Sequence, residues 1–363
     1  MNQVSLSSNQ GIWVVGTKFG AYYAHALQGR GLRALIGKEG IQGRQLAKKL
    51  NCDYFSDIES ALADNRPTCA IVAVRSSIVG GDGDQIVRRL LQEGIPVLQE
   101  LPMHPQDMVQ SLHIARENNT RFQITPFYDH TPSVRCFLHA AQKLSDQSGI
   151  RSVEMRVSIQ TLTCALLVLA EIIGSPSLAI TTTPMAGFAK ILISGSWQGI
   201  AVDIVLFNRF DAASPDDNAQ PLMQIILISD EGELMLHSPY GQVIWESRFQ
   251  QSQSIIKEQN IGQKDFLFYS SPLKGVPIQD HLFQDINSAI RSTVAQFITS
   301  HQANNAQLQR QLTVLQLWQI IGTQVGQPQQ QNLPPPKAIG NTAWGLLRES
   351  LNNGYYYPSR KYR

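Results

Sequence analysis

Residues 12–125 alternate short apolar runs with amphipathic helical patterns, and no other feature of the sequence restricts the fold as strongly. Short apolar runs predict buried strands, whereas apolar residues repeated at three and four positions predict helices. Strands joined by crossover helices form a parallel sheet, and right-handed crossovers cover both of its faces. The pattern therefore predicts an α/β fold that begins with a doubly wound parallel sheet over residues 1–126. The predicted strands are 12–15, 33–36, 70–74, 95–98 and 121–125, and the predicted helices are 21–28, 43–50, 84–93 and 105–118.

The pattern changes after Phe127. A predicted helix over 132–144 is followed by strand-like runs, several of which are joined by tight turns such as Ser229–Gly232. Tight turns join antiparallel neighbours, so residues 127–325 are predicted to form an α+β domain with a largely antiparallel or mixed sheet, ending in helical patterns. Gln- and Pro-rich sequence then predicts a linker and C-terminal tail over 326–363.

Composition narrows the classes of partner. The 363 residues carry a net charge of +2, which gives no reason to expect a nucleic acid or a membrane as a partner. The 4 cysteines lack paired spacing, so neither a disulfide framework nor a metal site is expected. Residues 1–10 lack a signal-peptide core, and the apolar run Cys164–Ala170 is too short to span a bilayer. A cytoplasmic protein of two domains is expected.

A glycine-containing loop follows the first predicted strand, and it reads Gly16-Thr17-Lys18-Phe19-Gly20. Gly16 permits a tight turn, and Gly20 lets the next helix pack close to the sheet. The start of that helix offers backbone N–H groups and a positive dipole end to a pyrophosphate. Lys18 replaces the middle glycine of the usual fingerprint, so an ordinary strand-to-helix turn is the alternative. The position of the loop favours a Rossmann dinucleotide-binding site.

Cations follow the second predicted strand, at Lys38 and Arg44. A 2′-phosphate is stabilised by ammonium and guanidinium groups, so these residues favour NADPH. Glu39 favours NADH instead, because an acidic group at this strand end binds the ribose hydroxyls of NADH. A solvated helix face is the alternative for the two cations.

Polar residues also follow the third predicted strand. Arg75, Ser76 and Ser77 come directly after it, and residues 80–83 add three glycines. A dinucleotide lies at the carboxyl ends of the strands, so these three side chains are candidates for lining the diphosphate or the nicotinamide ribose. A purely structural loop is the alternative.

The fourth predicted strand runs into Glu100-Leu101-Pro102. Many two-domain nicotinamide dehydrogenases carry Glu-Lys-Pro at this place, with the lysine at the reacting carbon. Glu100 is predicted to bind the nicotinamide ribose, and Pro102 to shape the turn. The glutamate and the proline of this motif are kept, but Leu101 stands in place of the catalytic lysine. This difference indicates a reductase with changed chemistry.

Three side chains near these strand ends are candidate proton donors: Tyr128, His104 and His130, in that order of preference. Reduction needs a proton on the heteroatom besides a hydride on carbon, and a positioned acid accelerates that transfer. The structural alternatives are a core tyrosine, a helix-capping histidine and a surface histidine.

The second domain lacks a pair of residues that sugar-type members of this fold usually carry. Those members have an Asp and a His one helical turn apart, whereas residues 160–167 here read Gln-Thr-Leu-Thr-Cys-Ala-Leu-Leu. Alcohol oxidation has therefore lost its usual base. An apolar pocket with weak acids suits the reduction of an activated C=N bond.

Several segments together resemble the thiazolinyl imine reductases of siderophore biosynthesis, a branch of the Gfo/Idh/MocA oxidoreductases. The segments occur in the family's order from near the start of the chain to about residue 245. They are Val15–Gly20, Val74–Ser77 with Gly80–Gly83, Gln99–Pro105, Phe127–Thr131 and Ser238–Trp245.

The resemblance implies NADPH-dependent reduction of a thiazoline to a thiazolidine. The substrate would be a thioester on a carrier domain of a nonribosomal peptide synthetase, in the assembly of a yersiniabactin- or pyochelin-like siderophore. Tyr128 matches a proposed general acid of the family. A histidine that another member has at the position of Leu101 is absent, which gives Tyr128 and His104 more weight. The resemblance also implies a homodimer formed through the sheet of the second domain.

Two other functions fit parts of the sequence. The first is a sugar or cyclitol dehydrogenase of the same fold, which would oxidise polyols with NAD(P)⁺. The second is a non-catalytic protein that binds NADP(H) and regulates a partner, which Leu101 would permit.

Overall fold

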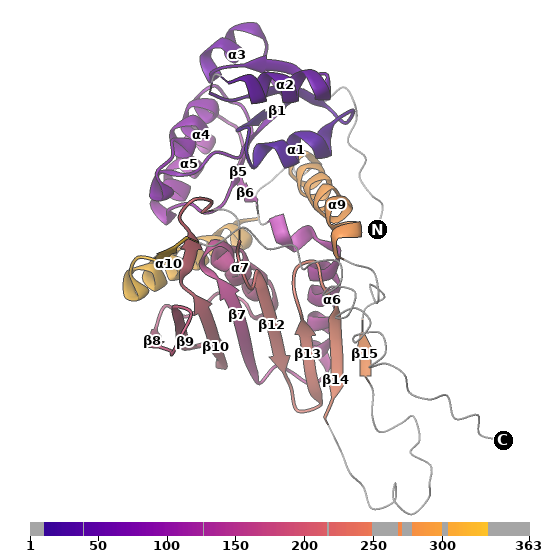
Figure 1. Cartoon of the computed structure of the whole chain (residues 1–363), viewed down its shortest axis with the longest axis vertical. Helices are drawn as coiled ribbons and strands as arrows, with labels where there is room; N and C mark the ends of the chain where they lie inside the picture. Colours follow the sequence, from indigo (N-terminus) through magenta and orange to yellow (C-terminus); the bar gives the residue numbers. More distant parts are fainter. Residues whose placement is uncertain are drawn as a thin grey trace, which may run out of the picture.

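The structure is a computed structural model of the chain. It describes residues 11–38, 40–125, 127–215, 218–248, 268–270, 278–299 and 304–332. Two sheets lie end to end in the molecule, with helices on both faces of the first sheet (Figure 1). The tail at 333–363 and Glu39, on which the NADH alternative depends, lie outside the described residues.

The first sheet has six parallel strands among the described residues, in the order β3-β2-β1-β4-β5-β6. Its central strands are buried along their whole length, as expected where helices cover both faces. The predicted doubly wound parallel sheet is thus confirmed. Its strands are β1 (Ile12–Val15), β2 (Leu32–Ile36), β3 (Asp53–Phe55), β4 (Cys69–Val72), β5 (Val97–Glu100) and β6 (Phe122–Thr125), and its helices are α1 (Gly20–Leu27), α2 (Ile41–Leu50), α3 (Ile58–Asp64), α4 (Gly83–Gln92) and α5 (Pro105–Glu117).

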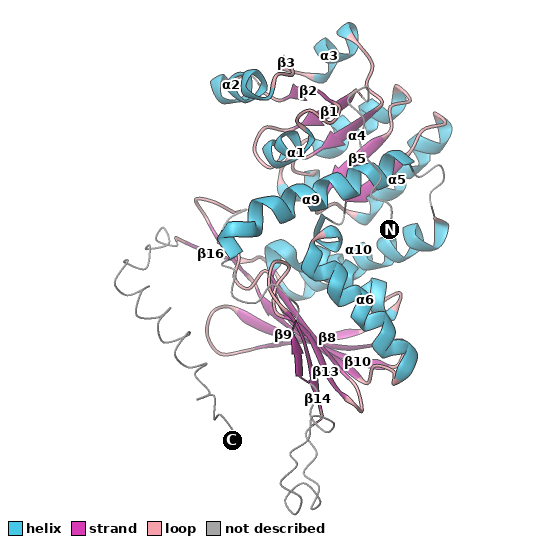
Figure 2. Cartoon of the chain, turned by 90° about the vertical axis from the view of Figure 1, so that its right-hand side faces the viewer, coloured by secondary structure: helices cyan, strands magenta, loops and turns pink. Residues whose placement is uncertain are grey.

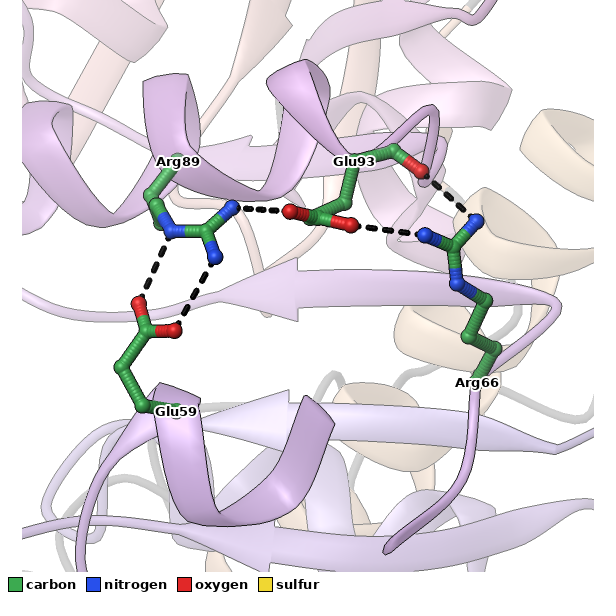
Figure 3. Close-up of polar contacts among 4 residues, drawn as sticks. All are labelled: Glu59, Arg66, Arg89 and Glu93. Atoms are coloured by element: carbon green, nitrogen blue, oxygen red, sulfur yellow. Dashed lines mark hydrogen bonds and ion pairs between the residues drawn. The ribbon is translucent and has the colours of Figure 1, made fainter. Parts of the chain in front are cut away.

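The sequence pattern missed strand β3 and helix α3. Strand β3 lies at the edge of the sheet and is only partly buried, so its residues show no apolar run. Ion pairs hold this region together: Arg89 of α4 pairs with Glu59 of α3 at 2.8 Å and with Glu93, and Arg66 pairs with Glu93 at 2.6 Å (Figure 3). Because these groups are mostly exposed, the network orients the helices more than it stabilises the fold.

The second sheet is mixed, with the strand order β15-β14-β13-β12-β7-β10-β9-β8. Strands β7 and β10 are parallel, and the other neighbours are antiparallel. Helices α6 (Pro132–Gln147) and α7 (Leu162–Ile173) pack on one face. Figure 2 shows α6 lying along this sheet. The predicted α+β domain with a mixed sheet is confirmed. Its strands are β7 (Ser152–Ser158), β8 (Ile180–Pro184), β9 (Lys190–Trp197), β10 (Ile200–Phe207), β12 (Met223–Ile228), β13 (Gly232–Leu236), β14 (Val243–Ser247) and β15 (Phe268–Ser270).

Helix α9 (Ile278–Thr299) follows the second sheet in sequence but packs on the first domain. Its buried face, which includes Ile290 and Phe297, joins the core beneath α1. Arg291 Nε also donates to the carbonyl of Ala26 at 2.7 Å. Helix α10 (Asn305–Val325) then contacts both α5 and α7. These two helices tie the domains together.

The start of the predicted linker is ordered. Strand β16 (Gln329–Gln331) pairs in parallel with β11 (Arg209–Asp211), so the linker prediction is wrong for these residues. Backbone pairing, which glutamine allows as well as any residue, decides this and leaves no apolar pattern in the sequence. Within the described part of the chain, every helix is too short or too polar to cross a membrane.

Candidate active site

The carboxyl ends of the parallel strands bring separate loops to one edge of the first sheet. The loop after β1, the loop after β4, Glu100 at the end of β5 and the short 3₁₀ helix η2 (Phe127–His130) after β6 all lie there. This edge faces the second domain (Figure 1). Dinucleotides and their substrates bind at such an edge in open α/β sheets.

The loop after β1 has the geometry of an anion cradle. Gly16 has φ +114°, and a Cβ there would lie 2.5 Å from the carbonyl oxygen of Ala73. Only glycine lets the chain turn this close to strand β4. Within the described residues, the backbone N–H groups of Thr17, Lys18 and Phe19 donate to no carbonyl, although they stand at the start of α1. The loop therefore fits the pyrophosphate of a dinucleotide.

The end of β2 is shaped by close packing around Thr17. A Cβ on Gly37 would lie 2.5 Å from Thr17 Cγ2, and one on Gly43 would lie 3.2 Å from the same methyl group. The Tyr54 hydroxyl donates to the Gly37 carbonyl at 2.9 Å. These contacts hold the loop after β2 against the glycine loop.

The two predicted cations lie beside this junction. Lys38 is almost fully exposed and pairs with Asp82 at 3.6 Å, across the strand ends. The Arg44 guanidinium lies 5.9 Å from the centre of the Tyr54 ring. An exposed ion pair exchanges readily for another anion. The structure thus brings both Lys38 and Arg44 close to the carboxyl end of β2.

The loop after β4 is held mainly by its own polar groups. Ser76 is buried and its hydroxyl donates to the Pro102 carbonyl at 2.7 Å. The Ser77 N–H donates to Asp84 Oδ2 at 2.7 Å, and its hydroxyl lies 3.2 Å from Asp107 Oδ2. The Ser76 side chain therefore supports the Leu101–Pro102 turn, which is the structural alternative for this residue, while Arg75 remains exposed on the loop.

Replacing Ser76 with alanine is expected to lower the free energy of unfolding by about 1 kcal/mol, because the part-buried Pro102 carbonyl loses the hydroxyl of the buried Ser76 as its donor. The matched control is Ser77→Ala, whose hydroxyl bond is exposed and whose N–H bond to Asp84 is kept. Urea unfolding of both variants checks the prediction. An equal change in the two variants would contradict it.

Glu100 is joined to an inward-facing tyrosine of α1. The Tyr23 hydroxyl donates to Glu100 Oε2 and lies 3.4 Å from the Thr125 hydroxyl. Burial raises the pKa of Glu100 to about 7. Burial, followed by the nearby Glu100 charge, raises the pKa of Tyr23 well above its ordinary value. Glu100 thus keeps its proton to a higher pH than an exposed carboxyl group does.

Tyr128 lies among aromatic rings at the end of β6. Its ring centre is 5.0 Å from that of Phe127 and 6.1 Å from that of Tyr240. Burial, followed by Tyr240, Cys164 and Glu100, raises the pKa of Tyr128 well above its ordinary value. In the part of the chain that is described, the Tyr128 hydroxyl has no hydrogen-bond partner. It is a protonated phenol that remains available to a ligand.

Two further groups with raised pKa values lie near Tyr128, one on η2 itself and one on α7, which packs against η2. Cys164 lies in the first turn of α7, and burial, followed by Glu100 and Asp129, raises the pKa of its thiol. Burial raises the pKa of Asp129 as well, and its Oδ1 is buried without a partner among the described residues. Both groups are therefore held in the protonated form.

The two candidate histidines are placed differently. His104 is the N-cap of α5, where its Nδ1 accepts the N–H of Gln106 at 3.1 Å. His130 is mostly buried, and burial lowers its pKa to about 4. His104 therefore has a capping role, while its part as a proton donor stays a prediction, and His130 is a neutral interior group rather than a surface residue.

Sequence reasoning missed Tyr23 and Asp129 as members of the site, and it treated Cys164 only as a buried thiol. Tyr23 had a usable signal, because the buried positions of α1 include 20, 23, 24 and 27, which is one helical face. The places of Asp129 and Cys164 depend on how η2 and α7 meet across the domain boundary, which no local pattern encodes.

Comparison with known proteins shows a family resemblance in the first domain and a shared fold over most of the chain. Residues 11–125 match the family model described as "Oxidoreductase family, NAD-binding Rossmann fold" (GFO_IDH_MocA). A search of curated protein sequences found no match.

Solved structures resemble the chain over most of its length. A Gfo/Idh/MocA family oxidoreductase from Vibrio cholerae has a TM-score of 0.63 and 12% identity, over 87% of this chain and 98% of that one. A levoglucosan dehydrogenase in complex with NADH and levoglucosan has a TM-score of 0.62 and 9% identity, over 86% and 96%. A myo-inositol dehydrogenase from Corynebacterium glutamicum ATCC 13032 has a TM-score of 0.60 and 11% identity, over 89% and 99%. At these identities the likeness shows the fold.

The family match covers the glycine loop and all six strands of the first sheet, and the structural likeness extends through the second domain. Residues 11–125 therefore resemble the NAD-binding Rossmann domain of the Gfo/Idh/MocA oxidoreductases, and the chain as a whole shares the fold of the solved structures.

Proposed function

We propose that the chain is an NADPH-dependent reductase that converts a thiazoline C=N bond to a thiazolidine. One observation carries the proposal: the Tyr128 hydroxyl lies at the strand ends without a hydrogen-bond partner among the described residues, beside groups whose protons are held by burial. Tyr128, Asp129 and Cys164 have raised pKa values. A site loaded with protons suits a reaction that consumes one, whereas alcohol oxidation needs a base.

The reduction needs a hydride on the imine carbon and a proton on the imine nitrogen, and residues of this chain would supply the proton. A bound dihydronicotinamide supplies a hydride to the imine carbon. The Tyr128 hydroxyl, free of internal partners among the described residues, donates the proton to the imine nitrogen. Leu101 and the apolar face of α7 keep water away, since both pack on the hydrophobic core. Glu100, held by Tyr23, is proposed to bind the nicotinamide ribose.

NADPH is proposed as the cofactor because Lys38 and Arg44 lie beside the loop after β2. Replacing either with alanine is expected to raise the KM for NADPH about tenfold, since a charge-assisted contact to phosphate contributes roughly 1.5–3 kcal/mol. The KM for NADH is expected to stay within about twofold of the wild-type value, because NADH has no 2′-phosphate for these cations to contact. Lys48→Ala is the control, because it removes an exposed cation from the far end of α2. Equal effects on both cofactors would contradict the assignment.

The substrate is proposed to arrive as a thioester on a carrier domain of a nonribosomal peptide synthetase, in the cytoplasm. A homodimer is proposed through the second sheet. Its strands present half-buried Ile226, Ile228 and Met235 on the face opposite α6, while Ile225 and Leu227 point inward. Light scattering in solution gives the oligomeric state.

A sugar or cyclitol dehydrogenase is the second candidate. Its support is the fold likeness to proteins described as levoglucosan and myo-inositol dehydrogenases. The absence of an Asp, Glu, His or Lys from residues 160–167, which lead into and form the start of α7, is less favourable to it.

One experiment separates the candidates. The chain is mixed with NADPH and a thiazoline thioester, and separately with NADP⁺ or NAD⁺ and a panel of sugars and cyclitols, and the absorbance of the reduced cofactor is followed. Consumption of NADPH with the thioester supports the reductase. Formation of reduced cofactor with a polyol instead establishes the dehydrogenase. Cofactor binding without either reaction points to a regulatory protein.

A further inference from the structure

We propose that Tyr54, on the edge strand β3, is a positioning residue for NADPH that holds Lys38 and Arg44 ready to bind one 2′-phosphate. This inference rests on the proposed NADPH-dependent function, of which it concerns only the cofactor. Tyr54 is half-buried and packs against the core that α1 and β1 form. Its strand shows no apolar run, so the sequence pattern gives no sign of a cofactor role.

The hydroxyl of Tyr54 holds the backbone at the end of β2. It donates to the carbonyl oxygen of Gly37 at 2.9 Å and to that of Lys38 at 3.0 Å, so one proton is shared between two successive peptide groups. The Lys38 side chain itself is 91% exposed. Its direction therefore depends largely on the peptide groups that Tyr54 holds.

The ring of Tyr54 contacts the first turn of α2. The Arg44 guanidinium lies 5.9 Å from the ring centre, within the range of a cation–π contact. A Cβ on Gly43 would lie 2.7 Å from Tyr54 Cε2, so a side chain there would displace the ring. The ring thus lies against the backbone one residue before Arg44. The same side chain therefore holds both ends of the segment that carries the two cations.

Holding the two cations in advance lowers the entropy cost of binding a phosphate. Lysine and arginine side chains lose conformational freedom when a ligand immobilises them, and a backbone that is already fixed reduces that loss. In the free protein the Lys38 ammonium pairs with Asp82 at 3.6 Å, and an exposed pair of this kind exchanges readily for another anion. NADH lacks the 2′-phosphate, so the contacts of Tyr54 should favour NADPH alone.

The test measures the binding of NADP⁺ and of NAD⁺ by calorimetry, without substrate. Tyr54→Phe is expected to raise the Kd for NADP⁺ about threefold to tenfold, because the shared hydrogen bond is lost. Tyr54→Leu also removes the ring and is expected to raise this Kd about tenfold or more. The Kd for NAD⁺ should stay within about twofold of the wild-type value in both variants.

Two controls separate this role from a general disturbance of β3. Asp53→Asn removes a charge of the same strand that pairs with Arg33 at 3.2 Å, and it should leave both Kd values unchanged. The second control is a double-mutant cycle. When Tyr54→Phe is added to the Lys38→Ala, Arg44→Ala variant, the Kd for NADP⁺ should change by less than about twofold, because the cations through which Tyr54 acts are gone. An undiminished loss in that background overturns the inference.

The outcomes distinguish this inference from the proposed function. An equal rise of both Kd values in Tyr54→Phe overturns the role of Tyr54 alone. Wild type that binds NADP⁺ no tighter than NAD⁺ overturns the NADPH assignment and the inference together. If wild type prefers NADP⁺ but reduces no thiazoline, the proposed reaction is wrong, while a selective loss of NADP⁺ binding in Tyr54→Phe still supports the positioning role.

Discussion

Phenylalanine in place of Tyr128 is expected to lower kcat by about 10²–10⁴, because a positioned general acid contributes that much to proton transfer. The hydroxyl is the only atom removed, and the ring contacts to Phe127 and Tyr240 are kept. The hydroxyl makes no hydrogen bond within the described residues, so its loss strands no internal partner. Stability should therefore change little.

Stopped-flow consumption of NADPH measures the rate, and fluorescence titration should give an unchanged Kd for the cofactor. His104→Ala is the comparison, since this residue caps α5 through Nδ1. It is expected to lose a little stability, roughly 0.5–2 kcal/mol for a lost cap, with activity close to wild type. If Tyr128→Phe and His104→Ala leave turnover unchanged both alone and together, the acid lies elsewhere.

Glutamine in place of Glu100 is expected to change how stability depends on pH. Burial raises the Glu100 pKa from 4.5 to about 7. Between these pH values the folded chain keeps a proton that the unfolded chain releases, so wild-type stability falls as pH rises and levels off above about pH 7. The corresponding free energy is about 3 kcal/mol. Glutamine keeps an acceptor for the Tyr23 hydroxyl but does not ionise.

The pH dependence of wild-type stability alone would not reveal the contribution of Glu100. His130 acts in the opposite direction, because burial lowers its pKa from 6.5 to about 4. In that range the unfolded chain binds a proton that the folded chain does not, so stability rises with pH. Asp129, with its raised pKa, acts in the same direction as Glu100. The difference between variant and wild type isolates the Glu100 contribution.

Urea unfolding of wild type and Glu100→Gln at a series of pH values provides the measurement. The variant is expected to gain about 3 kcal/mol relative to wild type between pH 4.5 and 7. His130→Gln is the control, because its effect on the pH dependence of stability should be opposite. This variant should lack the loss of stability toward low pH that the buried neutral His130 causes. A constant difference between Glu100→Gln and wild type across this range would show that Glu100 ionises normally in the folded chain.

Long periodic segments of the fold were predictable, and short or remote ones were not. The buried strands β1 and β4 and helix α5 were expected close to their observed bounds because their apolar patterns are local. Strand β3 escaped notice since an edge strand of three residues is only partly buried. Helix α9 was expected as a helix, but its docking on α1 depends on contacts with residues more than two hundred positions away.

The sequence by itself determined the first sheet apart from its edge strand β3, the glycine loop and the absence of a cation at Leu101, since backbone geometry and residue type act locally there. Only the tertiary structure decided the chemistry around Tyr128. The pKa values of Asp129, Cys164 and Glu100 are raised because elements from both domains exclude water from them together, and desolvation is a property of the assembled fold.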